Sequence, residues 1–486
     1  MNSNRFRRWT RRLGAAVTVL ALSVAGAVAI APAANAASIG DITGTTGTLT
    51  IHKHGADPGA PGNGTQLTPA PALPLSGVTF SVQRVANAGV PLDLTTTQGW
   101  NLAAPSGTAL TPAQAQTAPY SVAASGGPGY YSVTTIADGT ATLTNLPYGL
   151  YLVTETGVGS NPVVSRAQPF LVSVPYPTGT VGSPANSWIY DVHVYPKNKL
   201  NTTVPTKTVS DPGTPVLGET VNWTITAPVP PLAAGGTYNT FIVRDTIDSR
   251  LTVTGVTVTI DGVATTDFTV TPAGAANGPI VVTLNDPNTK LAGKAGKNVV
   301  VTVTTRVDSL GSDGKITNIA IVNVNDSSIT TNPSQTNWGP AQIVKTNASN
   351  PGQTLQGAQF EVWTAKENGT KVLGPLTTNA NGQINIAGLW VGSDSTTLSR
   401  DYWIKEIQAP AGYITPTGDA AWTKVTVRAG GAGTPVTVTV ANTQQPGPIL
   451  PLTGSTGTAM FVIVGLVLVG VGVGTFAYRR IRAAHR

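Results

Sequence analysis

The stretches GLYLVTE at residues 149–155 and DYWIKE at residues 401–406 decide the fold. Side chains two apart in an extended chain share a face, so each stretch places two apolar side chains and a Glu on one side. The residues that share a face are Tyr151, Val153 and Glu155 in the first stretch, and Tyr402, Ile404 and Glu406 in the second. Both stretches therefore predict a strand with a Glu turned toward an apolar core.

The two stretches occupy the same place in a repeated layout. Each follows a strand that ends in Lys and a strand with the pattern GxxF, and each precedes a closing strand with Asn. The matching segments are TLTIHK (48–53), LSGVTFSV (75–82) and DVHVYPKN (191–198), then AQIVK (341–345), LQGAQFEV (355–362) and VTVTVAN (436–442). This repeat predicts two copies of one β-domain. Residues 200–336 lack the layout and predict a different β-sandwich.

The net charge of +7 belongs to the two ends of the 486-residue chain. Five arginines lie in the first dozen residues and four in the last eight: Arg5, Arg7, Arg8, Arg11, Arg12, Arg479, Arg480, Arg482 and Arg486. The rest of the chain holds 20 basic and 22 acidic residues. Nucleic-acid binding needs basic residues clustered in a folded domain, so this distribution excludes that class.

The N-terminus has the pattern of an export signal, and the C-terminus has the pattern of a membrane anchor. Residues 1–36 have the pattern of a secretory signal peptide that ends in Ala34-Asn35-Ala36, so the mature chain is predicted to begin at Ala37. Residues 459–478 carry no charge and predict a transmembrane helix, with the basic tail inside. The chain has no cysteine, which excludes the disulfides that usually brace secreted domains.

Strand parity predicts three buried groups of Lys, acid and Asn. The predicted groups are Lys53, Glu155 and Asn198; Lys207, Asp245 and Asn318; and Lys345, Glu406 and Asn442. In the middle group Asn318 is preferred over Asn325, because it lies in phase with Ala320 and Val322. Burial disfavours charge, which turns Lys into a nucleophilic amine and the acid into a proton donor.

Such a group can react with itself. The amine attacks the Asn amide, ammonia leaves, and a covalent Lys-Asn isopeptide bond remains. A buried ion pair with a hydrogen-bonded Asn is the alternative. The residues alone leave both interpretations open.

Three motifs bear a family resemblance. GPILPLTGSTGTAM (447–460) contains LPxTG at Leu450, Pro451, Leu452, Thr453 and Gly454, followed by the apolar segment and basic tail. WIYDVHVYPKN (188–198) resembles a pilin motif whose lysine is Lys197, and KEIQAPAGY (405–413) resembles an E-box. Over nearly its whole length the chain resembles the major (backbone or shaft) pilins of sortase-assembled pili of Gram-positive bacteria.

The resemblance implies an all-β chain of tandem Ig-like sandwiches. The expected parts are a signal peptide (1–36), a B-type domain ending in the pilin motif (37–198), an A-type domain (199–337), a B-type domain with the E-box (338–446) and a sorting signal (447–486). We refer to the three domains as the first, middle and third sections. The first section departs from the family pattern, because ETGVGSN replaces the APxGY ending after Glu155.

The resemblance also implies a function. A sortase would cut between Thr453 and Gly454, and Lys197 of the next subunit would attack the acyl-enzyme. Strand parity predicts that Lys197 faces solvent. The implied product is a covalent homopolymer that carries accessory pilins, is attached to peptidoglycan and supports adhesion at the cell surface. The implied chemistry is a single self-crosslinking turnover with no cofactor or metal, so no enzyme is expected.

Two other function classes were compared. A single-copy wall-anchored adhesin or a pilus tip subunit that binds host matrix or glycans needs no acceptor lysine, although the sequence identifies no receptor. An enzyme is disfavoured because the four histidines (His52, His54, His193 and His485) have no metal-ligand spacing. His52 and His54 are predicted to be solvated, opposite Lys53. Residues 95–127 predict either a binding insertion or a flexible flap.

Overall fold

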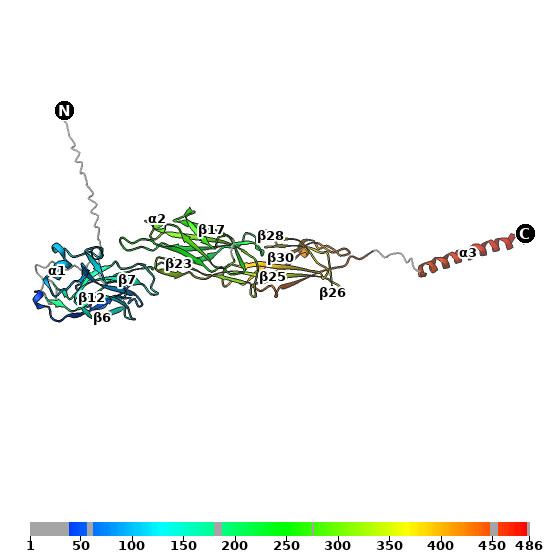
Figure 1. The fold of residues 1–486 in the computed structure, drawn as a ribbon. Coiled ribbons are helices and arrows are strands. Elements are labelled where there is room, and N and C mark those ends of the chain that lie inside the picture. The colour runs from blue at the N-terminus through cyan, green and yellow to red at the C-terminus, as the bar shows by residue number, and fades with distance from the viewer. Residues whose placement is uncertain (1–37, 56–61, 179–186, 275–276, 448–454, 484–486) are drawn as a thin grey trace, which may run out of the picture. The chain divides into compact units, whose positions relative to one another are not determined.

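The computed structural model describes residues 38–55, 62–178, 187–274, 277–447 and 455–483, and Figure 1 shows its strands and helices. The predicted signal peptide and the LPLTG motif lie outside these residues. Two compact units are present, one from Met1–Gly339, Gly388–Ser399 and Arg428–Gly433, the other from Pro340–Ala387, Arg400–Val427 and Thr434–Arg486. Strands dominate both units, so the all-β prediction is confirmed.

In the first section, two sheets enclose a core that includes Leu49, Ile51, Phe80 and Val153. The smaller sheet has the order β12-β1-β6, and β1 pairs in parallel with β12. The larger has the order β3-β2-β7-β9, with β4 and β5 also on β2. Their bounds are β1 Thr46–His52, β2 Thr79–Asn87, β3 Val90–Pro91, β4 Tyr120–Val122, β5 Tyr130–Thr134, β6 Thr140–Pro147, β7 Gly149–Gly157, β9 Phe170–Val174 and β12 Asp191–Val194.

Residues 95–127 fold against the first section. They form helix α1 (Thr97–Ala103) and strand β4, and side chains such as Trp100 and Leu110 pack in a second small core. Trp188, at the start of the pilin motif, belongs to the same core and lies 5.3 Å from the Trp100 ring. The flexible-flap alternative is therefore wrong.

The middle section is a sandwich of two five-stranded sheets, with Trp223 and Phe241 in its core. The sheet orders are β14-β15-β21-β17-β18 and β19-β20-β16-β23-β24. The bounds are β14 Thr206–Val209, β15 Thr220–Pro228, β16 Phe241–Asp245, β17 Leu251–Ile260, β18 Val263–Thr265, β19 Phe268–Thr271, β20 Ile280–Leu284, α2 Pro287–Leu291, β21 Asn298–Val307, β22 Lys315–Asn318, β23 Ala320–Val324 and β24 Ser327–Thr330. Short pairs elsewhere are β8 Val163–Ser165 with β13 Lys199–Leu200, and β10 Tyr176–Pro177 with β11 Trp188–Ile189.

The third section repeats the pairing of the first. Its strands are β25 Ser334–Asn347, β26 Asn350–Thr354, β27 Gln359–Trp363, β28 Lys371–Thr377, β29 Gln383–Gly392, β30 Ser399–Gln408, β31 Trp422–Arg428 and β32 Val436–Asn442. β25 pairs in parallel with β32, as β1 does with β12. The GxxF phenylalanine lies opposite the Glu in both copies, Phe80 to Glu155 and Phe360 to Glu406. The predicted repeat is thus visible in the strand register.

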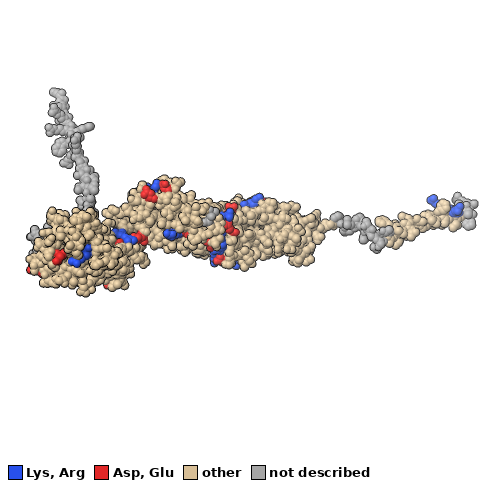
Figure 2. Space-filling model, in the orientation of Figure 1, with Lys and Arg blue, Asp and Glu red and all other residues tan. Residues whose placement is uncertain are grey.

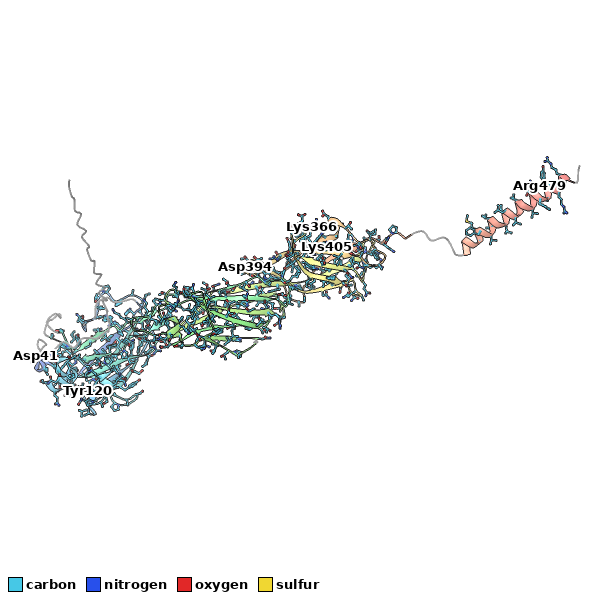
Figure 3. The ribbon with its side chains drawn as sticks, turned by 90° about the horizontal axis from the view of Figure 1, so that it is seen from above. Asp41, Tyr120, Lys366, Asp394, Lys405 and Arg479 are labelled. Atoms are coloured by element: carbon cyan, nitrogen blue, oxygen red, sulfur yellow. The ribbon has the colours of Figure 1, made fainter. Side chains whose placement is uncertain are left out.

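Helix α3 (Ser455–Ala483) ends the described chain. Within residues 459–482, an 18-residue window has a mean hydropathy of 2.5 and no buried residue, so this helix is long and apolar enough to cross a membrane. In Figure 3 the labelled Arg479 marks its basic end. On the face drawn in Figure 2, charged residues of both signs are few and scattered across the folded sections.

Candidate functional site

The first triad lies between the two sheets of the first section. Lys53 follows β1, Glu155 lies on β7, and Asn198 follows β12. Lys53 Nζ is 3.0 Å from Glu155 Oε2 and donates to Asn198 Oδ1 at 2.7 Å. Asn198 Nδ2 in turn donates to Glu155 Oε1 at 2.8 Å. The amine is therefore beside the amide, and one carboxylate contacts both groups.

The surroundings of the first triad complete its hydrogen bonds. Lys53 Nζ also donates to Pro196 O at 3.0 Å, and the side chains of Lys53 and Glu155 are fully buried. The N–H of Ala167 donates to Asn198 Oδ1 at 2.7 Å and is 3.3 Å from Glu155 Oε2. Burial lowers the pKa of Lys53 to about 8, although Glu155 opposes the shift. Free amine is thus accessible near neutral pH.

The middle triad has the same three groups in another sandwich. Lys207 lies on β14, Asp245 ends β16, and Asn318 ends β22. Lys207 Nζ is 2.6 Å from Asp245 Oδ2, and both side chains are fully buried. Burial lowers the pKa of Lys207 and raises the pKa of Asp245, whereas the ion pair and the Asn318 amide partly offset the shift of the acid. Both groups are thus driven toward their neutral forms.

The choice between two asparagines in the middle section has a structural basis. Asn318 is 1 % exposed, and its amide lowers the pKa of Asp245 against the effect of burial. Asn325 lies in the turn between β23 and β24 with a φ of 51°, and its Nδ2 donates to Val164 O and Thr237 O. The side chain of Asn325 is therefore hydrogen-bonded to backbone carbonyl groups, whereas the side chain of Asn318 interacts with Asp245.

The third triad joins β25, β30 and β32. Lys345 Nζ is 3.2 Å from Glu406 Oε2 and donates to Val440 O at 3.1 Å. Asn442 is 3 % exposed, and its Nδ2 donates to Ile414 O at 2.8 Å. Burial lowers the pKa of Lys345 and raises the pKa of Glu406, against the opposing effects of the ion pair and of Asn442. This pair is also driven toward amine and acid.

An aromatic ring lies beside each of the three lysines. The distances from Nζ to the ring centroid are 5.8 Å for Lys53 and Phe80, 5.7 Å for Lys207 and Trp223, and 5.9 Å for Lys345 and Phe360. Sequence reasoning did not assign these rings to the sites. The GxxF pattern was the signal for Phe80 and Phe360, since it places the Phe opposite the Glu. Each ring excludes water from the amine.

Lys197 is half-buried, rather than facing solvent as predicted. Residues 62–67 hydrogen-bond to the chain just before Lys197. The N–H of His193 donates to Gly64 O at 2.9 Å, and the N–H of Leu67 donates to Tyr195 Oη at 2.7 Å. β12 ends at Val194, so Lys197 lies beyond the strand in which parity applies.

The prediction that His52 and His54 are solvated was also wrong. His52 is 5 % exposed and His54 is 8 % exposed, so neither is solvated. His52 stacks on the Tyr195 ring, and its Nε2 lies 2.8 Å from His193 Nδ1. Burial and the neighbouring His193 lower the pKa of His52 to about 4. Among the described residues, no three His, Asp or Glu side chains are arranged to hold a metal ion.

Two family models match the chain. A model of the Gram-positive pilin subunit D1, N-terminal domain, matches residues 44–199, and a model of a prealbumin-like fold domain matches residues 339–444. These ranges contain the first and third triads with Lys197. The model ranges agree with the two copies of the repeated layout.

Whole-chain relatives are fimbrial proteins. The fimbrial subunit type 2 of Actinomyces naeslundii is 31% identical, over 98% of this chain and 97% of that protein. The fimbrial subunit type 1 of Actinomyces viscosus is 28% identical, over 95% and 96%. The full-length major pilin SpaD from Corynebacterium diphtheriae has a TM-score of 0.59 at 26% identity, over 82% of this chain and 98% of that chain. The major pilin SpaA of the same species shares the fold, with a TM-score of 0.53 at 21% identity over 82% and 100%.

Proposed function

Because the chain belongs to the sortase-assembled major pilins of Gram-positive bacteria, and is thus a structural surface subunit and not an enzyme, we propose that it builds the shaft of a covalent pilus. A sortase joins Thr453 of one copy to Lys197 of the next. The finished polymer carries accessory pilins and is attached to peptidoglycan. The three sections are braced internally by Lys-Asn isopeptide bonds.

The observation that carries this proposal is how Lys197 is held. Lys53 donates to Pro196 O and to Asn198 Oδ1, the residues on either side of Lys197. The chain is therefore fixed immediately before and after the acceptor lysine. A side chain presented from so well-fixed a backbone suits an acceptor that must meet a large acyl-enzyme and then transmit force.

The internal bonds follow from the chemistry of the triads. The acid takes one proton from the Lys ammonium, and the free amine attacks the Asn side-chain carbon. The acid then gives that proton to the amide nitrogen, the carbon–nitrogen bond breaks, and the carboxylate takes the second proton from the attacking Lys nitrogen. The sum is one amide exchanged for another with release of one ammonia per bond. The buried, ring-lined surroundings favour this step because they disfavour the charged pair that precedes it.

The bonds supply the brace that a chain without cysteine lacks. In the first and third sections each bond ties the opening strand to residues at the end of the closing strand, almost a whole domain later. A disulfide that closes a comparable loop contributes roughly 2–5 kcal/mol, largely by restricting the unfolded chain. A crosslinked section also passes tension along covalent bonds instead of through its hydrogen-bonded core.

Polymerisation is tested with Lys197→Arg, which keeps the charge but removes the primary amine. Cells that express the wild type with its sortase should yield a ladder of polymers that survives boiling in detergent. The variant should yield monomer alone. The matched control is Lys199→Arg, since Lys199 is exposed and lies two residues away. A ladder that persists in Lys197→Arg contradicts the assignment of the acceptor, and monomer alone in the wild type favours the single-copy adhesin.

A further inference from the structure

Residues 163–167 lie between the first triad and the middle section. This strip begins with β8, whose strand partner in the described chain is the two-residue β13. It ends at Ala167, whose N–H donates to the Asn198 carbonyl oxygen at 2.7 Å. Gln168 and Pro169, which follow, are exposed. Within the first section, the strip contacts Asn198 and Glu155 through the Ala167 N–H.

The middle section supplies further contacts to the same strip, and both lie within one compact unit. Val164 is 1 % exposed and belongs to the hydrophobic core of the middle section. Its carbonyl oxygen accepts from Asn325 Nδ2 at 2.6 Å. Ser165 Oγ accepts from the N–H of Ala233 at 3.2 Å. Successive residues before Ala167 are thus anchored outside the first section.

Arg166 makes the most directional of these contacts. Its Nε and Nη2 donate to Asp326 Oδ2 and Oδ1 at 2.8 and 2.9 Å, and its Nη1 donates to Thr156 O at 2.9 Å. A bidentate pair fixes the orientation of the guanidinium as well as its distance. Arg166 therefore links the strand that carries Glu155 to the turn that carries Asp326, next to Ala167.

We propose that the middle section positions the Ala167 N–H to stabilise the oxyanion that forms on Asn198 when Lys53 attacks it. This inference rests on the proposed crosslinking of the first section. Attack forms the bond between Lys53 Nζ and Asn198 Cγ and moves the carbonyl electron pair onto Oδ1. Glu155 relays the proton from Nζ to Nδ2, and the bond between Cγ and Nδ2 breaks with loss of ammonia. Arg166 and Asp326 act through Ala167, so they are positioning residues.

The size of the effect follows from what is removed. Loss of an oxyanion-stabilising donor slows acyl transfer by about 10²–10³-fold. Loss of the Arg166–Asp326 pair leaves the donor present but less well held, so a smaller slowing of about fivefold is expected. The Asn325 and Ser165 contacts remain in place in that case.

The test uses the full-length chain, sampled at intervals after a short pulse of synthesis and mapped by mass spectrometry for each crosslinked peptide. Asp326→Asn should slow the Lys53–Asn198 bond about fivefold and leave the Lys345–Asn442 bond unchanged. Asp326→Glu should restore the rate. The matched control is Asp308→Asn, which removes an exposed pair with Arg306 that lies within the middle section.

The outcomes separate this inference from the proposal beneath it. An equal first-bond rate in wild type and Asp326→Asn overturns the positioning role and leaves the crosslinking intact. Absence of the Lys53–Asn198 peptide from the wild type at every time overturns the first bond and this inference with it. Slowing of every bond, or no recovery in Asp326→Glu, shows a general folding defect and also overturns the positioning role.

Discussion

The first and third triads contain the same residue types at matching places in a repeat, yet they polarise the asparagine differently. In the first, Asn198 Oδ1 accepts from the N–H of Ala167 as well as from Lys53. In the third, Asn442 Oδ1 has no hydrogen bond within the described part of the chain, and burial raises the pKa of Glu406. Under the proposed crosslinking, a backbone donor in the first triad and an acid of raised pKa in the third would be alternative means of activating the amide.

The largest expected effect is the complete loss of the bond between Lys207 and Asn318 in the middle triad. Asn318→Ala removes the amide that would react with Lys207, so the middle bond should be lost completely. The mass deficit relative to the variant's own sequence should then be one ammonia smaller. Loss of the crosslink should lower the free energy of unfolding of this section by roughly 2–5 kcal/mol. Asn325→Ala is the matched control and should keep the bond. An intact middle bond in Asn318→Ala, by peptide mapping, would show that another asparagine reacts.

Removal of the acid should separate the two triads directly. Glu406→Gln takes away the proton relay and the only polarising group proposed for the third site, so that bond should fail to form. Glu155→Gln should slow the first bond by a smaller factor, because the Ala167 N–H still contacts Asn198. Time-resolved peptide mapping measures both. The control is Glu361→Gln, which alters a partly exposed acid on β27. Equal slowing of the first and third bonds would show that the two asparagines are activated in the same way.

Removal of the backbone donor is the reverse experiment. Ala167→Pro deletes the N–H that contacts Asn198 Oδ1, and should slow the first bond about 10²-fold. The middle and third bonds, which have no part in this contact, should form at the wild-type rate. Thermal unfolding of the variant reports whether the first section remains folded. If the first bond forms at the wild-type rate in a folded variant, the Ala167 N–H does not stabilise the oxyanion on Asn198.

A smaller effect concerns pH, and it is expected in the first section alone. The pKa of His52 falls to about 4 in the folded chain from 6.5, so between these values the unfolded chain binds more protons than the folded one. Stability should therefore fall as the pH falls from 6.5 toward 4, by about 1–3 kcal/mol for this group. His52→Gln should flatten the change in a series of thermal unfolding curves. The third section has no histidine and gives the reference, and an equal acid response there would contradict the assignment.

Much of the triad geometry could be predicted because it depends on local alternation along strands. The side on which Lys53, Glu155 or Glu406 lies is fixed by its neighbours two residues away, and the buried groups follow from that parity. The repeat likewise predicted two copies of one β-domain, and the first and last strands of each copy pair in parallel. The apolar face of each strand and the type of each residue were enough to predict these features.

The remaining features depend on packing between segments that are distant in sequence. Tyr195, whose hydroxyl accepts from the N–H of Leu67, stacks on His52, so His52 is buried against the prediction. Lys197 lies beyond the end of β12 and is half-buried, also against the prediction. Ala167 contributes only a backbone N–H, so no side-chain pattern could reveal it. Its placement depends on contacts of residues 163–166 with the middle section, and strand parity carries no information on such contacts.

The most direct test of the account is the intact mass of the mature chain, residues 37–453, compared with the mass of its sequence. Each isopeptide bond removes one ammonia, so the account predicts a deficit of three ammonias, with peptide mapping placing them at Lys53–Asn198, Lys207–Asn318 and Lys345–Asn442. A deficit of two that lacks the first pair would contradict the role given to Ala167. A mass equal to the sequence mass would contradict the central claim that these buried triads crosslink the pilin.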